Sequence, residues 1–138
     1  MEQKFDTEII RLITLFENLT DAPVKDCVIN NDTIYFIVEE GKVGIAIGKN
    51  GSKVKHAENL IKKKIKIIEF SNDPIVFVKK MIPQIADVKI RNENKKAVVE
   101  LKVEKKYRAL VIGRDGRNLK LYEKILRRNH DIDNLIIR

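Results

Sequence analysis

The sequence predicts an α+β fold in which one unit, helix–strand–strand–helix–helix–strand (αββααβ), occurs twice in 138 residues. The main observation is a repeated glycine motif. Residues 47–51 read IGKNG and residues 112–116 read IGRDG, and the two copies are 65 residues apart, from 113 − 48. Apolar residues before and after the motif match at the same offset, for example Ile45 with Leu110. A motif repeated together with its apolar neighbours indicates a structural unit used twice.

The elements of the first unit follow from hydrophobic periodicity and turn residues. Asp6 is a suitable N-terminal cap, and apolar residues then recur at helical spacing as far as Leu19. The predicted elements are a helix from Thr7, strands 24–29 and 33–39, a short helix 41–47, a helix 52–64 and a strand 65–70. The apolar residues of the longer helix after the glycine motif, all expected to face the core, are Val54, Ala57, Leu60 and Ile61.

The second unit repeats this order. Asp73 and Pro74 predict a helix start, with the aspartate as cap and the proline at the first helical position, and Pro83 predicts that this helix is short. The further predicted elements are strands 87–91 and 97–103, a short helix 104–112, a helix 117–128 and a strand 132–137. The predicted boundary gives two domains, residues 1–71 and 72–138, without a flexible Gly/Ser linker.

Positive charge is concentrated around the two glycine motifs. The formal net charge is +8; residues 42–66 hold eight lysines against one acidic residue, and residues 102–128 hold ten basic residues against three acidic ones. Such a distribution suits a polyanion such as nucleic acid. The single cysteine, Cys27, excludes an intrachain disulfide and is expected in the core, and the two histidines lack the spacing of a metal site.

A glycine-flanked turn at the start of a helix is suited to binding phosphate. The first amides of a helix have no intrahelical partner and carry partial positive charge, and glycine lacks the Cβ that would keep a sugar-phosphate chain away. The candidate contact residues of the first copy are Ile45, Ile47, Gly48, Lys49, Asn50, Gly51, Ser52, Lys53 and Lys55. Those of the second copy are Leu110, Ile112, Gly113, Arg114, Asp115, Gly116, Arg117, Asn118 and Lys120.

Within these sets, the apolar residues before each glycine loop are expected to line a groove for bases, and the others to contact the backbone. Aromatic residues make up only 6% of the chain and most fall at expected core positions, so base stacking is expected to be minor. Asp115 is an exception among polar loop residues, because a carboxylate that faces a phosphate repels it. The two loops are therefore expected to contribute unequally.

The two glycine motifs, each followed three residues later by an apolar residue, resemble the signature of the KH family of single-stranded RNA-binding domains. The KH loop clamps four nucleotides of backbone, and the order αββααβ resembles the type II form of the fold. The resemblance implies two type II KH domains, each with a three-stranded mixed sheet covered by helices on one face.

A narrower resemblance rests on residues 67–74 (IIEFSNDP) and 112–118 (IGRDGRN), which are similar to the tandem KH module of NusA-type transcription factors. The chain is similar to the short, archaeal-type members that have two KH domains and no S1 domain. This implies binding to single-stranded nascent RNA, an influence on transcription elongation or termination, and RNA polymerase as a further partner. We expect a cytoplasmic protein, because a signal-peptide pattern and a membrane-spanning apolar run are both absent from the sequence. We also expect a monomer that needs no cofactor.

Other interpretations fit less well or remain open. A nucleotide-binding P-loop is excluded because Val43 and Asn50 break its pattern, and no catalytic set of side chains stands out, so an enzyme is not expected. A ribosome-associated or ribosome-maturation KH protein that binds structured ribosomal RNA is the main alternative. A protein-binding stripe of Phe5, Ile9 and Phe16 is more often core, and duplex DNA recognition lacks evident base-reading residues.

Overall fold

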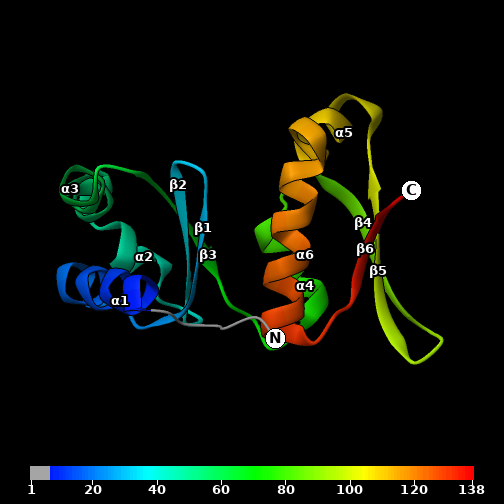
Figure 1. Cartoon of the computed structure of the whole chain (residues 1–138), viewed down its shortest axis with the longest axis horizontal. Coiled ribbons are helices and arrows are strands. Elements are labelled where there is room, and N and C mark those ends of the chain that lie inside the picture. Colours follow the sequence, from blue (N-terminus) through cyan, green and yellow to red (C-terminus); the bar gives the residue numbers. More distant parts are fainter. Residues whose placement is uncertain (1–6) are drawn as a thin grey trace. The chain divides into compact units, whose positions relative to one another are not determined.

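The computed structural model describes residues 7–138, so the predicted cap Asp6 and the stripe residue Phe5 lie outside the described residues. The chain divides between Ser71 and Asn72 into two compact units. Each unit contains its own three-stranded sheet packed with helices (Figure 1).

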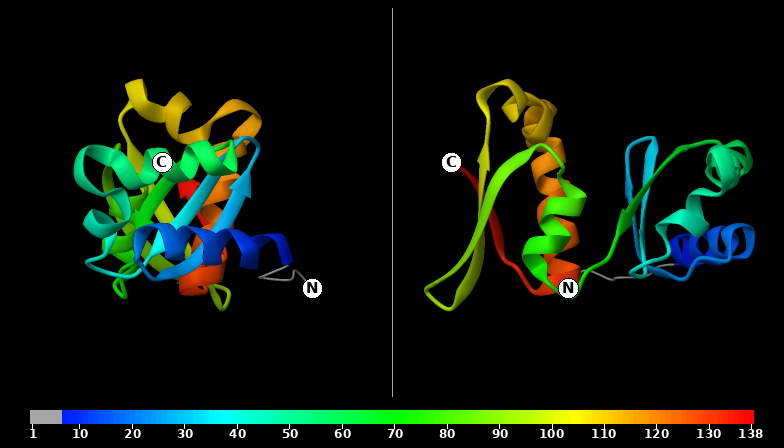
Figure 2. Two further views of the ribbon diagram at one scale, coloured as in Figure 1. Left: turned by 90° about the vertical axis from the view of Figure 1, so that its left-hand side faces the viewer. Right: turned by 180° about the vertical axis from the view of Figure 1, so that it is seen from behind.

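In the first unit, strand β2 is central: it pairs antiparallel with β1 and parallel with β3, so the sheet is mixed. The three helices lie on one face of this sheet (Figures 1 and 2). The elements are α1 (Thr7–Thr20), β1 (Val24–Asn30), β2 (Thr33–Val38), α2 (Val43–Ile47), the turn η1 (Lys49–Gly51), α3 (Ser52–Ile61) and β3 (Lys64–Glu69).

The second unit has the same topology, with β5 antiparallel to β4 and parallel to β6. The elements are α4 (Pro74–Met81), β4 (Ile85–Glu93), β5 (Lys96–Val103), α5 (Lys105–Ile112), the turn η2 (Arg114–Gly116), α6 (Arg117–His130) and β6 (Asn134–Ile137). Helices α4 and α6 lie against one face of this sheet (Figures 1 and 2). The predicted α+β class, the αββααβ order and the mixed sheets are confirmed.

Helix α4 begins as its sequence predicts. The carboxylate of Asp73 accepts hydrogen bonds from the backbone N–H groups of Ile75 (2.9 Å) and Val76 (3.5 Å), and Pro74 occupies the first turn. This side-chain cap satisfies two amides that the helix itself leaves without partners. The helix ends at Met81, ahead of Pro83.

Two glutamates explain why acidic residues occur inside the basic segments. The Glu58 carboxylate, on α3, accepts a hydrogen bond of 2.9 Å from the N–H of Ile65 in β3. The Glu123 carboxylate, at the matching position of α6, accepts one of 3.1 Å from the N–H of Leu135 in β6. In each unit this contact joins the helix after the glycine loop to the closing parallel strand, so both glutamates serve the fold.

The core of the first unit forms between α1 and the sheet. Phe16 and Phe36 are fully buried, and their rings stack with centroids 4.0 Å apart. Ile9 packs against the same cluster, which also contains the buried Cys27. The described part of the α1 stripe is therefore core, as expected, because its burial removes apolar surface from water.

Helix α3 differs from the prediction in two respects. It ends at Ile61 and not at residue 64, because Lys62 adopts the left-handed conformation (φ 67°) that terminates a helix, and β3 begins at Lys64. The prediction that Leu60 faces the core is wrong, since its side chain is 54% exposed. With about 100° of rotation per residue, Leu60 lies about 60° from the buried Ala57, on the opposite side from Ile61, which packs against the core, so Leu60 falls at the edge of the buried face.

Candidate nucleic-acid interface

The two glycine loops have nearly the same backbone. Gly48 has φ 78° and ψ 171°, and Gly113 has φ 76° and ψ 170°. Gly51 and Gly116 both have φ 73° and ψ 15°. Each turn is closed by a hydrogen bond from the N–H of its second glycine to the carbonyl of its first, at 3.1 Å and 3.2 Å. The sequence repeat is thus a structural repeat in detail.

The second residue between the glycines is left-handed in both loops. Asn50 has φ 56° and ψ 29°, and Asp115 has φ 56° and ψ 28°. Asparagine and aspartate tolerate this conformation better than other residues with a Cβ. The backbone therefore accounts for Asp115 without any favourable contact to a phosphate, and its side chain is exposed.

The first glycine of each loop is required by close packing. A Cβ on Gly48 would lie 2.6 Å from Cγ and 3.0 Å from the backbone nitrogen of Lys53. A Cβ on Gly113 would lie 2.7 Å from Cγ and 2.9 Å from the backbone nitrogen of Asn118. A Cβ on Gly116 would meet nothing within 4 Å. The first glycine thus lets the turn pack on the following helix, whereas the space beside the second glycine is open to a ligand.

The helices that follow the loops begin without a side-chain cap. The caps of α3 and α6 are Gly51 and Gly116, and neither helix has a side-chain hydrogen bond at this end. In α4, by contrast, the Asp73 carboxylate occupies that place. The starts of α3 and α6 therefore hold no side-chain acceptor. The N–H groups of Ser52 and Arg117 donate within the turns to the carbonyls of Lys49 and Arg114, and the helix dipole favours negative charge at this end.

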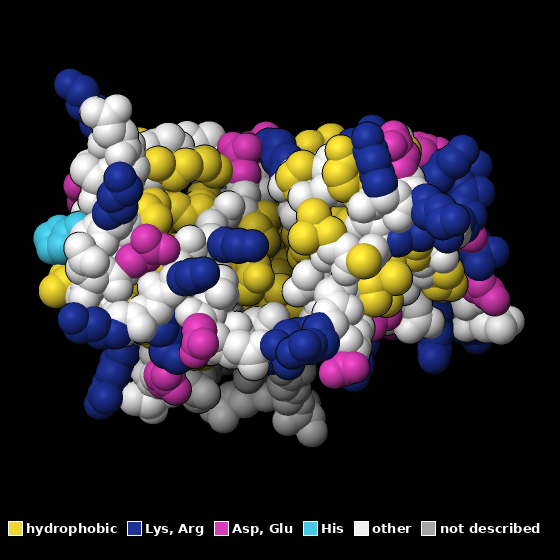
Figure 3. Space-filling model, turned by 90° about the horizontal axis from the view of Figure 1, so that it is seen from above, with side chains coloured by type: hydrophobic (Ala, Val, Ile, Leu, Met, Phe, Trp, Pro, Cys, Tyr) yellow, Lys and Arg dark blue, Asp and Glu magenta, His cyan; other side chains and the backbone are white. Residues whose placement is uncertain are grey.

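Cations beside both loops extend into solvent. The exposed polar candidates are Lys49, Asn50, Ser52, Lys55, Arg114, Arg117 and Lys120. Within residues 7–138, neither Lys49 nor Arg114 has an ion pair or a side-chain hydrogen bond. Seen from above (Figure 3), Lys and Arg side chains stand out where α5 meets α6, and apolar side chains are exposed between them. This arrangement supplies unneutralised positive charge at the turn.

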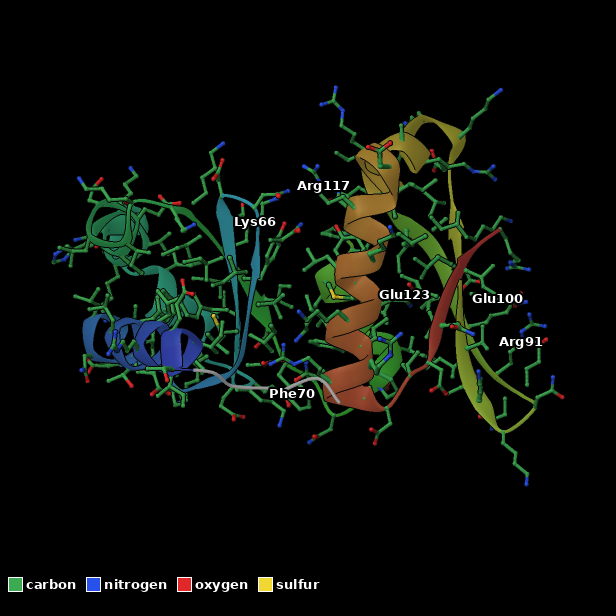
Figure 4. The ribbon with its side chains drawn as sticks, in the orientation of Figure 1. Lys66, Phe70, Arg91, Glu100, Arg117 and Glu123 are labelled. Carbon is green, nitrogen blue, oxygen red and sulfur yellow. The ribbon has the colours of Figure 1, made fainter. Side chains whose placement is uncertain are left out.

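On the sheet of the second unit, the cation Arg91 is neutralised locally. Arg91 pairs with Glu93 at 3.2 Å and with Glu100 at 3.6 Å. Arg91 and Glu100 extend from the sheet on the side away from α6, whereas Arg117 lies at the start of α6 (Figure 4). Arg91 is thus a neutralised cation, in contrast to Arg114 at the loop.

Two candidate residues turn towards the protein. The amine of Lys53 donates a hydrogen bond of 2.9 Å to the carbonyl of Thr20 at the end of α1. The amide of Asn118, at the matching position, donates one of 3.0 Å to the carbonyl of Leu110. Lysine and asparagine can both donate a hydrogen bond. Lys53 and Asn118 occupy matching positions of the two repeats, 65 residues apart, and this match is the signal in the sequence that could have indicated their structural role.

The apolar candidates divide into exposed and half-buried side chains. Ile45 and Leu110, at matching positions of α2 and α5, are 42% and 57% exposed. Ile47 is also exposed, whereas Ile112 is half-buried. The exposed residues beside the loops can contact bases. Leu60, which was predicted to be core, and Tyr107, which the sequence did not single out, are exposed as well.

Known proteins with the same features allow the family to be assigned. A family model described as KH domain matches residues 11–81, which include the first glycine loop. The chain belongs to the KH domain family. The second unit lies largely outside that match, but its strand topology and loop dihedral angles are those of the first, so the chain contains two KH folds. KH domains bind nucleic acid, which points to a binding protein and not an enzyme.

Proteins named "Probable transcription termination protein NusA" are similar over nearly the whole KH chain. The one from Methanocaldococcus jannaschii is 40% identical over 131 residues, which is 94% of this chain and 72% of that protein. The one from Methanococcus vannielii is 38% identical, covering 86% and 70%. The crystal structure of APE1850 is 28% identical, covers 97% of this chain and 100% of that chain, and has a TM-score of 0.80.

Other kinds of site find little support in the KH chain. Among residues 7–138 there is no group of three or more metal-ligating side chains, and none of their helices has the length and apolarity needed to cross a bilayer. Burial raises the pKa of the Tyr35 hydroxyl, which lies in β2 and outside both loops. Its titration therefore has no direct bearing on the glycine turns.

Proposed function

We propose that this tandem KH protein binds single-stranded RNA through both glycine loops and acts as a NusA-like factor in transcription elongation or termination. The observation that carries the proposal is the helix start without a side-chain cap behind each loop, bordered by Lys49 and Arg114, neither of which has an ion pair within residues 7–138. Two turns with the same backbone, each able to hold one stretch of phosphates, suit an extended single strand.

The role in transcription is supported by the relatives. Several archaeal proteins that match almost the full length of the chain carry the name of a transcription termination protein. A nascent transcript is single-stranded as it emerges, which matches the partner that the loops favour. We further propose that the remaining exposed loop residues, including Lys55 and Lys120, contact phosphates, and that Ile45 and Leu110 contact bases.

The test compares matched loop variants. Lys49→Asp with Asn50→Asp, and Arg114→Asp alone, create a Gly-Asp-Asp-Gly loop in the first and the second unit, since Asp115 is already present. Asp115 shows that the left-handed position accepts aspartate, so both variants should fold. Lys95→Asp is the control: it carries the same charge change as Arg114→Asp, in the β4–β5 hairpin at the other end of the sheet from α5 (Figure 1).

Binding is measured by fluorescence anisotropy of labelled single-stranded RNA, with circular dichroism to check folding. Each loop variant should weaken binding more than Lys95→Asp does, and log K of the wild type should fall with log[salt] by about 0.7 per phosphate neutralised. If the loop variants and the control behave alike, the charge acts non-specifically and the proposal fails. Stronger competition by structured ribosomal RNA than by single strands would favour the ribosomal alternative, and an unchanged pattern of transcripts in vitro would refute the transcription role.

A further inference from the structure

The helix before the glycine loop is longer in the second unit. Helix α2 starts five residues before Gly48, at Val43, whereas α5 starts eight residues before Gly113, at Lys105. The additional turn brings Tyr107 into a helix. Its counterpart in the first unit, at the same offset, is Lys42, which lies outside α2 as its cap residue.

The additional turn exposes an aromatic side chain beside the loop. Tyr107 is 36% exposed, and Leu110, one turn further along α5, is 57% exposed. Residues three apart on a helix are neighbours, so Tyr107 and Leu110 lie on one face of α5. We call the exposed apolar surface of these two side chains the step. Gly113 follows Leu110 by three residues, at the C-terminal end of the same helix.

The step is held in place by its neighbour in the chain. The guanidinium of Arg108 donates hydrogen bonds to the carbonyl of Val103 at the end of β5 (3.2 Å) and to the carbonyl of Arg138 after β6 (3.0 Å). Arg108 thereby ties the extra turn to the end of the sheet. A fixed backbone and a side chain with only two χ angles keep the entropy loss on binding small.

The surroundings of the step fit RNA better than an apolar partner. The ammonium of Lys106 lies 5.0 Å from the centre of the Tyr107 ring, and Lys105 and Arg114 are exposed nearby in the chain. Lys106 also pairs with Glu104 at 3.7 Å, but both side chains are well exposed, so this contact is weak. An aromatic face bordered by cations is the combination with which proteins hold successive bases of a single strand.

We propose that Tyr107 and Leu110 form a base-stacking platform, so that the second unit holds one nucleotide beyond the stretch clamped by its glycine loop. The base stacks on the tyrosine ring, and Lys106 moves from the ring to the adjoining phosphate. This inference rests on the proposed binding of single-stranded RNA. The second unit would then hold one nucleotide more than the first, because the first unit has a cation, Lys42, where the second has an aromatic ring.

The experiment uses tryptophan as a local probe, since the chain contains none. Tyr107→Trp, in the full chain, places one indole on the platform, and Lys42→Trp places one at the matching position of the first unit. Both are titrated with random-sequence single-stranded RNA while fluorescence and anisotropy are recorded. We expect saturable quenching for Tyr107→Trp with the same midpoint as the anisotropy, and little quenching for Lys42→Trp.

Affinity gives a second readout. Tyr107→Phe should bind RNA like the wild type, and Tyr107→Ala should bind about 5- to 100-fold more weakly, from the usual strength of stacking between a base and an aromatic ring. Absence of quenching together with unchanged affinity of Tyr107→Ala would overturn the platform, and a protein partner for this step would then be sought. If the loop variants lose binding while the Tyr107 variants keep it, only the platform fails; if the loop variants also keep binding, the proposed function fails.

Discussion

The two glycine loops have the same backbone but different surroundings. The backbone dihedral angles agree closely at the three loop positions compared, yet one loop carries Lys49 and Asn50 and the other Arg114 and Asp115. The helix before the loop has five residues in the first unit and eight in the second. The two units thus share the backbone that we propose for phosphate binding, whereas their side chains and helix lengths differ and give the two sites different charge and reach.

The strongest test of the shared backbone uses the two glycines of one loop. Gly113→Ala should lower the free energy of unfolding by about 2–4 kcal/mol, because the new Cβ meets the Asn118 backbone at 2.9 Å in addition to the strain of a positive φ. Gly116→Ala should cost only about 1–2 kcal/mol, since its Cβ enters open space and only the strain remains. Urea unfolding followed by circular dichroism measures both. Equal losses would contradict the packing role of the first glycine.

The next test removes the link between helix and closing strand in either unit. Glu58→Ala and Glu123→Ala should each lower the free energy of unfolding by about 1–3 kcal/mol, because a half-buried strand amide loses its acceptor. Each substitution also removes one negative charge, so a control with the same charge change is needed. Glu40→Ala, an exposed position with the same charge change, is the control in thermal unfolding and should have little effect. A greater loss in the control would show that the effect is one of charge and not of the hydrogen bond.

The sequence was sufficient to predict element order and loop positions, because glycine, the Asp73–Pro74 cap and apolar periodicity act locally. It was not sufficient for the direction of individual side chains. Lys53 has the type and position of a phosphate contact, yet its amine reaches the end of α1, which only the folded unit brings near. The exposure of Leu60 and Tyr107 likewise depends on where α3 ends and where α5 begins, and helix ends are set by single left-handed residues and tertiary contacts.

Substitutions of Lys53 and Lys55 should affect different properties: the first should affect stability and the second RNA binding. Lys53→Met should lower the free energy of unfolding by about 1–2 kcal/mol, because it removes a part-buried hydrogen bond from a charged donor, and should change RNA affinity little. Lys55→Met should leave stability unchanged, since its side chain is exposed, and should reduce the salt slope of RNA binding by about 0.7. Urea unfolding and anisotropy at several salt concentrations measure these effects. If instead Lys53→Met reduced the salt slope and Lys55→Met lowered the free energy of unfolding, Lys53 and not Lys55 would be the phosphate contact.

The smallest expected effect on RNA affinity concerns Asn50 and Asp115, which occupy the same backbone position of the two loops but differ in charge. Asp115→Asn should raise RNA affinity and Asn50→Asp should lower it, each by about two- to five-fold, because an exposed charge a few ångströms from a phosphate contributes on the order of 1 kcal/mol or less in water. Stability should not change, because both residue types accept φ 56°. The effect should vanish at high salt, where exposed charges are screened. If Asp115→Asn leaves affinity unchanged at low salt while Asn50→Asp weakens it, then the carboxylate of the second loop points away from the RNA, and the two units hold the backbone in different ways despite their common turn.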